Sequence, residues 1–311
     1  MNLPLLFLFS GQGSHYYQMG RELYEHNAVF RQWFMAGDAI VRERCGISIA
    51  EFIYDDRYTR GDSFDQIQFS HPAIFLVEVA TAQTLMDTGF RPAVVLGSSL
   101  GVFAAWVIAG TLDFADALRA VLNQAEVVAA CCPPGGMLAV MASPELYSKE
   151  KQLFAGCEVA GVNFDEHFVV SGPVNDLANC ENTLRTREIH HQRLPVSYAF
   201  HSHLIDPAAR PHRTFLRDLA LSAPRIPILP VPAGELHHET LWNAIRRPED
   251  FRAVVRDLEE RSYGYVDVGP SGTLATFVKY NLSPDSASLV FPIITRFGRE
   301  RSNIARLTAL D

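Results

Sequence analysis

Residues 95–103 read VLGSSLGVF, and they place two serines between two glycines with apolar residues on both sides. Residues 93–97 form a short apolar run typical of a buried strand, and residues 100–110 have the apolar composition of a buried helix. Between them, residues 97–101 fit the pattern G-x-S-x-G with Ser99 at its centre. This order of strand, tight turn and helix is the context in which that pattern carries a nucleophilic serine.

The physical basis of the motif is the sharpness of its turn. A strand that turns abruptly into a helix pushes the central side chain into the open, and flanking glycines let the backbone pass without Cβ clashes. The start of the helix then offers positive partial charge, which makes the N–H of Leu100 a natural donor to an oxyanion. The residues alone leave a second interpretation open, a glycine-rich turn whose serine only caps the helix.

Composition narrows the class of protein. The chain has 311 residues, 48% of them hydrophobic, and a formal net charge of −8, so a nucleic-acid-binding function is not expected. Five irregularly spaced cysteines predict a reduced, cytoplasmic protein without a disulfide framework. The apolar start has no basic region before it, and no apolar run approaches the roughly 18 residues of a membrane span, so we expect neither a signal peptide nor a membrane protein.

Almost all of the cations are arginines. Four of them follow one another closely near the end of the chain and could form a patch for an acidic protein partner: Arg246, Arg247, Arg252 and Arg256. The alternative is a solvated helix face, which charge clusters on helices usually are.

Two domains are predicted from the pattern of elements. Residues 5–9 form a buried strand that ends at Gly11-Gln12-Gly13, and helices are expected at 17–45, 70–89 (capped by Ser70) and 113–132. The Pro-Pro-Gly-Gly sequence at 133–136 breaks this pattern. After it come short strands at 137–143, 157–173 and 189–196 with helices between them, in the β-α-β-β-α-β order of a ferredoxin-like unit. We therefore expect an α/β chain whose large domain, 1–133 and 198–311, holds a small domain, 134–197, as an insertion.

A nucleophilic serine needs a base, and the chain has eleven histidines. His201 is a candidate because it follows the apolar segment LPVSYAF and precedes a polar turn, at the end of an expected strand. His201 and His203 would lie on one side of an extended segment, which raises the possibility of a metal site. No further cluster of ligands supports that possibility, so no metal is predicted.

Five segments occur in an order that resembles a known family. They are FSGQGSHYYQMG (9–20), GSSLGVFAAWVIAGTLDFADAL (97–118), VNFDEHFVVSGP (162–173), SYAFHSHLI (197–205) and VDVGPSGTLATFV (266–278). Together they resemble the malonyl-CoA:acyl-carrier-protein transacylases, and the resemblance runs from residue 3 to about residue 295. It implies an α/β-hydrolase-like large domain with a ferredoxin-like insertion, in agreement with the pattern of elements.

The resemblance assigns roles to matching positions. Ser99 corresponds to the serine that accepts the acyl group, and His201 to its general base. Gln12, in GQGS, corresponds to the residue whose backbone N–H joins that of Leu100 in the oxyanion hole. The family usually orients its histidine with a backbone carbonyl, which here is expected within RRPEDF, around Asp250.

Two departures from the family concern the choice of acyl group. The family motif is G-H-S-x-G, but Ser98 stands where the histidine is expected. The arginine that pairs with the malonyl carboxylate, 25 residues after the nucleophile, is replaced by Gln124. Without that charge a malonyl group should be a poor substrate, and a neutral group such as acetyl should fit better. We assign acyl selectivity to Gln124, Phe200 and Ser98. Ser98 could also fill space or hydrogen-bond to the turn. As the nucleophile it would fit the geometry of the turn less well than Ser99.

Within this family the chain is most similar to the stand-alone acyl hydrolases of trans-acyltransferase polyketide synthases. That branch implies a proofreading enzyme that removes acyl groups from acyl carrier proteins through a Ser–His acyl-enzyme. The alternatives are a trans-acting acyltransferase that loads acetyl or malonyl units, and an inactive scaffold that binds carrier proteins. We expect a monomer with no cofactor of its own, because the phosphopantetheine arm arrives with the carrier protein.

Overall fold

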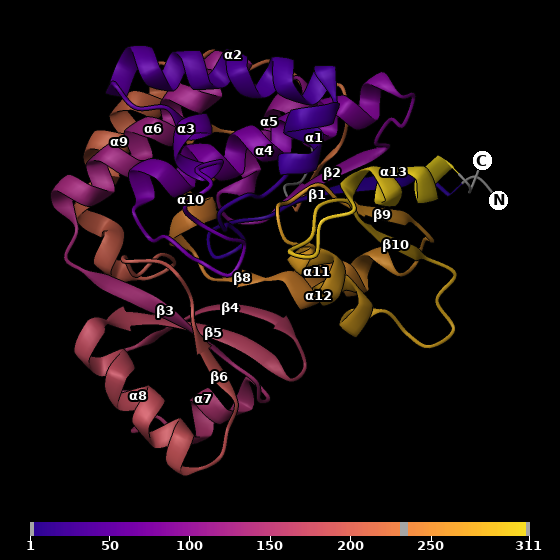
Figure 1. Cartoon of the computed structure of the whole chain (residues 1–311). Helices are drawn as coiled ribbons and strands as arrows, with labels where there is room; N and C mark the ends of the chain where they lie inside the picture. The colour runs from indigo at the N-terminus through magenta and orange to yellow at the C-terminus, as the bar shows by residue number, and fades with distance from the viewer. Residues whose placement is uncertain (1–2, 231–235, 309–311) are drawn as a thin grey trace.

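The computed structural model describes residues 3–230 and 236–308 (Figure 1). Its larger part is built on a five-stranded sheet in the order β10-β9-β1-β2-β7, in which every neighbouring pair is parallel. The strands are β1 (Leu5–Phe9), β2 (Val94–Gly97), β7 (Ile228–Leu229), β9 (Gly264–Asp267) and β10 (Leu289–Pro292).

Helices cover both faces of this sheet, which explains why its strands are continuous apolar runs. Phe7 and Phe9 of β1 belong to the large core with one set of helices, whereas Leu6 and Leu8 pack with the other set. The first set is α2 (Ala28–Cys45), α4 (Ile67–Asp87), α5 (Gly101–Ala109) and α6 (Phe114–Cys131); the second is α11 (Phe251–Leu258) and α12 (Thr273–Asn281). The remaining helices are α1 (Arg21–His26), α3 (Ile49–Ile53), η1 (His203–Ala208), α9 (Ala209–Arg217), α10 (His238–Arg246) and α13 (Glu300–Thr308).

Two expectations about helix boundaries were wrong. The segment 17–45 is divided at Asn27, whose side chain accepts a hydrogen bond from the Phe30 N–H (2.9 Å) and so caps α2. Helix α4 begins at Ile67, three residues before the expected cap Ser70. Ser70 therefore lies inside the helix and does not cap it, and its hydroxyl accepts a hydrogen bond from the side chain of Gln12 (3.1 Å).

The second sheet has the order β6-β3-β5-β4-β8 and lies below the first in Figure 1. Its first four strands are antiparallel neighbours, and the helices α7 (Glu145–Lys149) and α8 (Val174–Thr186) lie between them in the chain. This is the ferredoxin-like topology. The strands are β3 (Gly135–Val140), β4 (Glu158–Phe164), β5 (His167–Pro173), β6 (His191–Arg193) and β8 (Glu249–Asp250).

Strand β8 comes from outside the insertion. The chain returns from the large domain and pairs Glu249 with Gly161 and Asp250 with Val162, parallel to β4. A Cβ at Gly161 would lie 3.1 Å from the Glu249 carbonyl oxygen, so the glycine permits this close approach. The boundaries of the small domain, 134–197, stay a prediction, and its sheet takes one strand from beyond them.

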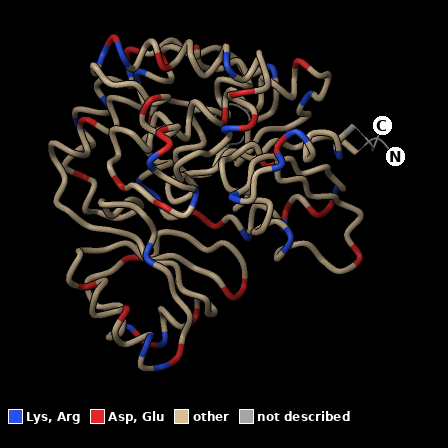
Figure 2. Tube along the Cα trace, viewed as in Figure 1, with Lys and Arg blue, Asp and Glu red and all other residues tan. Residues whose placement is uncertain are grey.

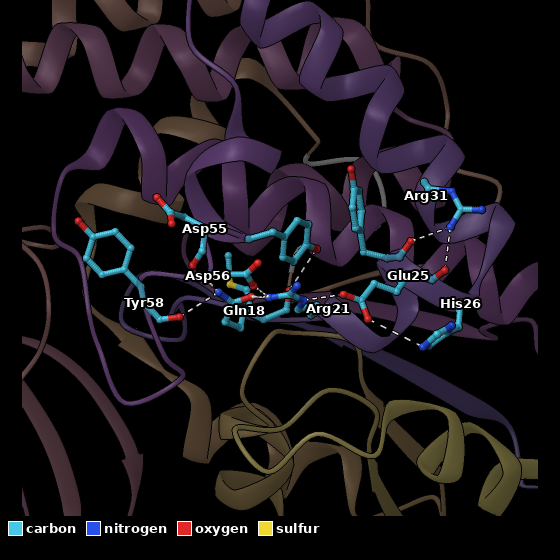
Figure 3. A network of polar contacts seen from close by, with 11 residues as sticks. Gln18, Arg21, Glu25, His26, Arg31, Asp55, Asp56 and Tyr58 are labelled. Atoms are coloured by element: carbon cyan, nitrogen blue, oxygen red, sulfur yellow. Dashed lines mark hydrogen bonds and ion pairs between the residues drawn. The ribbon is translucent and has the colours of Figure 1, made fainter.

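Polar contacts anchor the segment that follows β1 (Figure 3). The side chain of Gln18 donates hydrogen bonds to the carbonyls of Asp55 (2.7 Å) and Tyr58 (3.0 Å). Arg21, the first residue of α1, also pairs with Asp56 (2.5 Å), which lies in the same loop as Asp55 and Tyr58. The loop after α3 is thereby fixed to the stretch of chain that leads from Gln12 into α1.

Charges of both signs are interspersed over the chain (Figure 2). Within the expected arginine patch, Arg246 pairs with Asp206 (2.5 Å), and Arg252 and Arg256 both pair with Asp165 (3.2 and 2.7 Å). Three of its four cations are therefore already partnered. Among residues 3–230 and 236–308, no helix has the length and apolar character that crossing a membrane requires.

The buried Asp38 supports the start of α3, and its removal should destabilise the fold. Its carboxylate accepts hydrogen bonds from the Ser48 hydroxyl (2.9 Å) and from the N–H groups of Ile49 and Ala50. Asp38→Ala leaves these donors buried without an acceptor, and we expect a loss of about 3 kcal/mol in urea unfolding. The half-buried Asp116, whose carboxylate pairs with Arg119 and with no other cation among the described residues, is the matched control, and its alanine variant should lose about 0.5 kcal/mol. Equal losses in the two variants would contradict this account.

Candidate active site

Ser99 sits in a strained turn between β2 and α5. Its φ is 53°, a left-handed backbone conformation that a non-glycine residue rarely adopts. Two glycines make the turn possible: a Cβ at Gly11 would lie 2.7 Å from the Ser99 Cβ, and a Cβ at Gly101 would collide with the Phe9 carbonyl. The segment that follows β1 therefore packs directly against the turn, and the Ser99 side chain projects into a cavity.

His201 is brought to Ser99 from 102 residues further along the chain. The Ser99 Oγ and the His201 Nε2 are 2.9 Å apart, and the His201 Nδ1 lies 2.6 Å from the Arg247 carbonyl oxygen. A carbonyl only accepts, so Nδ1 carries the proton and the Nε2 lone pair faces the serine hydroxyl. This is the geometry of a general base that activates a nucleophile.

The orienting carbonyl belongs to Arg247, within the expected RRPEDF segment but three residues before Asp250. Helix α10 ends at Arg246, and Arg247 is its C-cap residue. The last carbonyls of a helix have no intrahelical partner, so one of them is free to bond the imidazole. The backbone N–H of His201 donates to the Ile245 carbonyl (2.8 Å), which fixes the histidine to the same helix end.

Burial lowers the pKa of His201, and the Arg246 charge acts in the same direction. The hydrogen bond to the Arg247 carbonyl opposes the shift without cancelling it. The imidazole is therefore neutral at neutral pH, the state in which it can accept the Ser99 proton.

The two expected oxyanion donors belong to segments that meet at Ser99, since Leu100 follows it in the chain and Gln12 follows Gly11, which packs against it. Leu100 is the residue before α5, and Gln12 lies in the turn after β1 and lines the cavity. In the described part of the chain, neither backbone N–H donates to another protein group. The side chain of Gln12 is held by Ser70 and by the Nδ1 of the buried His71. Neither N–H group is committed to a protein acceptor, and their role in an oxyanion hole stays a prediction.

The cavity has a volume of about 680 Å³ and lies between the two sheets. Such a volume is typical of small-molecule sites. One wall comes from the large domain and includes Gln12, Ser98, Ser99, Phe200, His201 and Glu249; the other comes from the small domain and is largely apolar, with Met137, Ala139, Phe164 and Val169. The apolar side suits an acyl chain, and the polar side carries the serine and histidine.

Of the three residues assigned to selectivity, Ser98 and Phe200 line the cavity and Gln124 does not. Gln124 is fully buried on α6, and neither atom of its amide has a hydrogen-bond partner in the described part of the chain. A buried amide without partners is costly and unusual. Its effect on acyl selectivity stays a prediction.

Glu249 is a site residue that the sequence reasoning missed. The Ser98 hydroxyl donates a hydrogen bond to its Oε2 (2.7 Å), and the side chain lines the cavity. Burial raises the pKa of Glu249 to about 7, while the Ser98 hydrogen bond opposes the rise. A signal was available in the sequence, because Glu249 lies in RRPEDF, the segment expected to orient the histidine. That expectation concerned a backbone carbonyl and considered no side chain of the segment.

The two histidines considered for a metal point to different partners. His201 faces Ser99, whereas His203 is exposed and pairs with Glu158. Among the residues that the structure describes, no three histidine, cysteine or acidic side chains are grouped so that they could hold a metal ion.

A fluorophosphonate probe, which forms an oxygen–phosphorus bond with an activated serine, should label this protein at Ser99. Ser99→Ala should abolish labelling and Ser98→Ala should retain it, whereas His201→Ala should slow it roughly 100-fold or more. Because the pKa of His201 is lowered, the labelling rate should stay constant as the pH falls to about 6.5, the ordinary histidine pKa. It should decrease only at lower pH. Mass spectrometry of the labelled peptide decides the site, and label on Ser98 would contradict the assignment.

Comparison with known proteins identifies the family. The signature of the acyl transferase domain family matches residues 6–280. The chain is 45% identical over 309 residues to the polyketide biosynthesis acyltransferase homolog PksD of Bacillus subtilis, covering 98% of this chain and 95% of that protein. It is 41% identical to the homolog BaeD of Bacillus velezensis, with 99% and 96% covered.

Solved structures agree. The acyltransferase domain from the second module of the salinomycin polyketide synthase superposes with a TM-score of 0.84 at 30% identity, covering 98% of this chain and 72% of that one. The malonyl CoA-acyl carrier protein transacylase of Coxiella burnetii gives a TM-score of 0.81 at 25% identity, with 99% and 97% covered. The resemblance of the five motifs is thus confirmed, and the chain belongs to the acyl transferase domain family and has its α/β fold.

Proposed function

We propose that this protein is a hydrolase that removes acetyl and other acyl groups without a carboxylate from the acyl carrier proteins of a polyketide synthase. The observation that carries the proposal is the Ser99–His201 pair, 2.9 Å apart, in a cavity with an apolar wall. The names of PksD and BaeD, two relatives of nearly the same length, support the polyketide context.

The reaction proceeds in two steps. Ser99 Oγ attacks the thioester carbonyl while His201 Nε2 takes its proton, and His201 returns that proton to the leaving thiol. Water then attacks the carbonyl of the acyl-serine ester while His201 takes a proton from the water. His201 returns this proton to Ser99 Oγ as the ester bond breaks, which releases the carboxylic acid and regenerates the serine. The N–H groups of Gln12 and Leu100 would stabilise the oxyanion in both steps.

A carrier protein is the proposed donor of the acyl thioester, and its phosphopantetheine arm would enter the cavity with the acyl group. The protein would need no cofactor of its own and act as a cytoplasmic monomer. The arginine patch is a weak candidate for carrier recognition, because Arg246, Arg252 and Arg256 already pair with carboxylates.

A second candidate is an acyltransferase that loads acetyl or malonyl units onto carrier proteins. It shares the acyl-enzyme and differs only in the second nucleophile, a carrier thiol instead of water. Membership of the acyl transferase family favours it. The third candidate, an inactive scaffold, does not need the close contact between Ser99 and His201.

Intact mass spectrometry of acyl-loaded carrier proteins distinguishes the three. Acetyl-, butyryl- and malonyl-carrier protein are incubated with the enzyme, with and without a second, empty holo-carrier, and Ser99→Ala serves as the control. We expect free holo-carrier from the acetyl and butyryl loads and little acyl group on the second carrier. Acyl transfer to the second carrier would establish a transferase, and no difference from Ser99→Ala would support the scaffold.

The residue at position 124 tests the selectivity inferred from the family. Gln124→Arg should raise the malonyl-to-acetyl ratio of kcat/KM roughly tenfold, because it restores the cation that pairs with a malonyl carboxylate. Gln124→Leu, which removes the unpaired amide without adding charge, is the matched control and should leave the ratio unchanged. An unchanged ratio in Gln124→Arg, with activity on acetyl retained, would refute this role.

A further inference from the structure

Glu249 is fixed in the wall of the acyl cavity by its backbone and by its side chain. Strand β8 pairs it with Gly161 of β4, which sets the direction of the chain. The next residue, Asp250, is exposed and accepts a hydrogen bond from the Ala253 N–H (2.9 Å), capping α11. Successive side chains of a strand point to opposite sides, so Glu249 points inward, where Ser98 bonds to it (2.7 Å).

The inward carboxyl has no cation as a partner. Within residues 3–230 and 236–308, no ion pair includes Glu249, and the arginines on neighbouring elements are turned to other groups. Arg246 pairs with Asp206, and Arg252 with Asp165 and Asp250. The side chain of Arg247 is exposed, while its carbonyl holds His201.

Three other residues with basic side chains line the cavity: His167, His201 and Arg296. Burial lowers the pKa of both His167, to about 4, and His201, so both rings are neutral near neutral pH. Arg296 is the one cation of this lining, but its side chain is exposed, lies over the Tyr16 ring (5.1 Å from its centre) and forms no ion pair with Glu249 among the described residues. Because the pKa of Glu249 is about 7, its carboxyl is largely ionised at pH 8 and largely neutral at pH 6.

A carboxylate in this position opposes a second one on the acyl group. Ser98 is the residue next to the nucleophile, so the carboxyl bonded to it lies near the acyl group that Ser99 carries. Two like charges a few ångströms apart in a cavity of reduced dielectric repel each other strongly, whereas a neutral acyl chain is unaffected.

We propose that Glu249, positioned by Ser98, is the residue that excludes carboxylated acyl groups from Ser99. This inference rests on the proposed function, since it names the substrate class of the same site. At position 124 the arginine is absent and so cannot attract a malonyl carboxylate. At position 249 a carboxylate, that of Glu249, is present and repels it.

The test compares two thioesters of N-acetylcysteamine that differ in one charge, the malonyl thioester and its monomethyl ester. The readout is the rate of Ser99 acylation in a single turnover, followed by intact mass at pH 8 and pH 6. The wild type should favour the ester at least 30-fold at pH 8 and clearly less at pH 6. The ratio of the two rates removes the effect of His201, because both substrates use the same base.

Glu249→Gln keeps the shape of the side chain and an acceptor for Ser98 but removes the charge. It should lower the ester-to-malonyl ratio at least tenfold and abolish the dependence of that ratio on pH. Ser98→Ala, which removes the positioning hydrogen bond but keeps the carboxyl, should lower the ratio by less than Glu249→Gln does. An unchanged ratio in Glu249→Gln would overturn the proposal, and so would an equal loss on both substrates, which would show that the pair only shapes the turn.

The outcome is separable from that of the proposed function. If Ser99 is acylated with the expected preference but passes the acyl group to a thiol instead of water, the hydrolase proposal fails and the role of Glu249 stands. If the wild type hydrolyses both thioesters equally well, the hydrolase stands and the role of Glu249 is refuted. Absence of acylation by either thioester would overturn both.

Discussion

The contact between the turn after β1 and the turn after β2 is the constraint on which the site depends. The parallel pairing of Phe9 with Gly97 brings these two turns to the same edge of the sheet. Gly11 and Gly101 then allow a separation that a single Cβ would prevent. Gln12 and Ser99, 87 positions apart in the sequence, therefore lie in one cavity wall because two strands share a register and two residues lack side chains.

The base reaches this wall through a different device. His201 has a φ of 61°, and the end of α10 holds it by two backbone carbonyls, those of Ile245 and Arg247. A carbonyl at a helix end is a fixed acceptor that cannot take up a proton, unlike a carboxylate. Of the imidazole and the group that orients it, only the imidazole therefore titrates.

The sequence was most informative where the chemistry is local. The strand–turn–helix around Ser99 and the order of the ferredoxin-like elements could be predicted, because each depends on apolar periodicity and on glycines close by in the chain. The pairing of Ser99 with His201 required the family resemblance. Ser70 was expected to cap α4. Its side chain instead bonds to Gln12, 58 positions away, a partner that local sequence does not reveal. Strand β8 was missed because a two-residue strand has no periodicity and its partner strand β4 lies about 90 positions earlier. The Ser98–Glu249 contact was missed because its two residues are about 150 positions apart.

Buried carboxyls support the nucleophile's surroundings as well as its selectivity. Glu78 of α4 accepts hydrogen bonds from both the N–H and the hydroxyl of Ser10, and burial raises its pKa well above the usual value. Asp267, at the end of β9, accepts from the N–H groups of Gly269 and Ala275, and burial raises its pKa to about 7. The Oε1 atom of Glu78 and both oxygens of Asp267 are used by N–H groups and a hydroxyl around the end of the central strands, whereas the buried Oε2 of Glu78 has no partner among the described residues. Glu249 differs from them because it is only half-buried, its partner is a single side chain and it faces the cavity, so of these three acids it is the one whose charge an incoming acyl group meets.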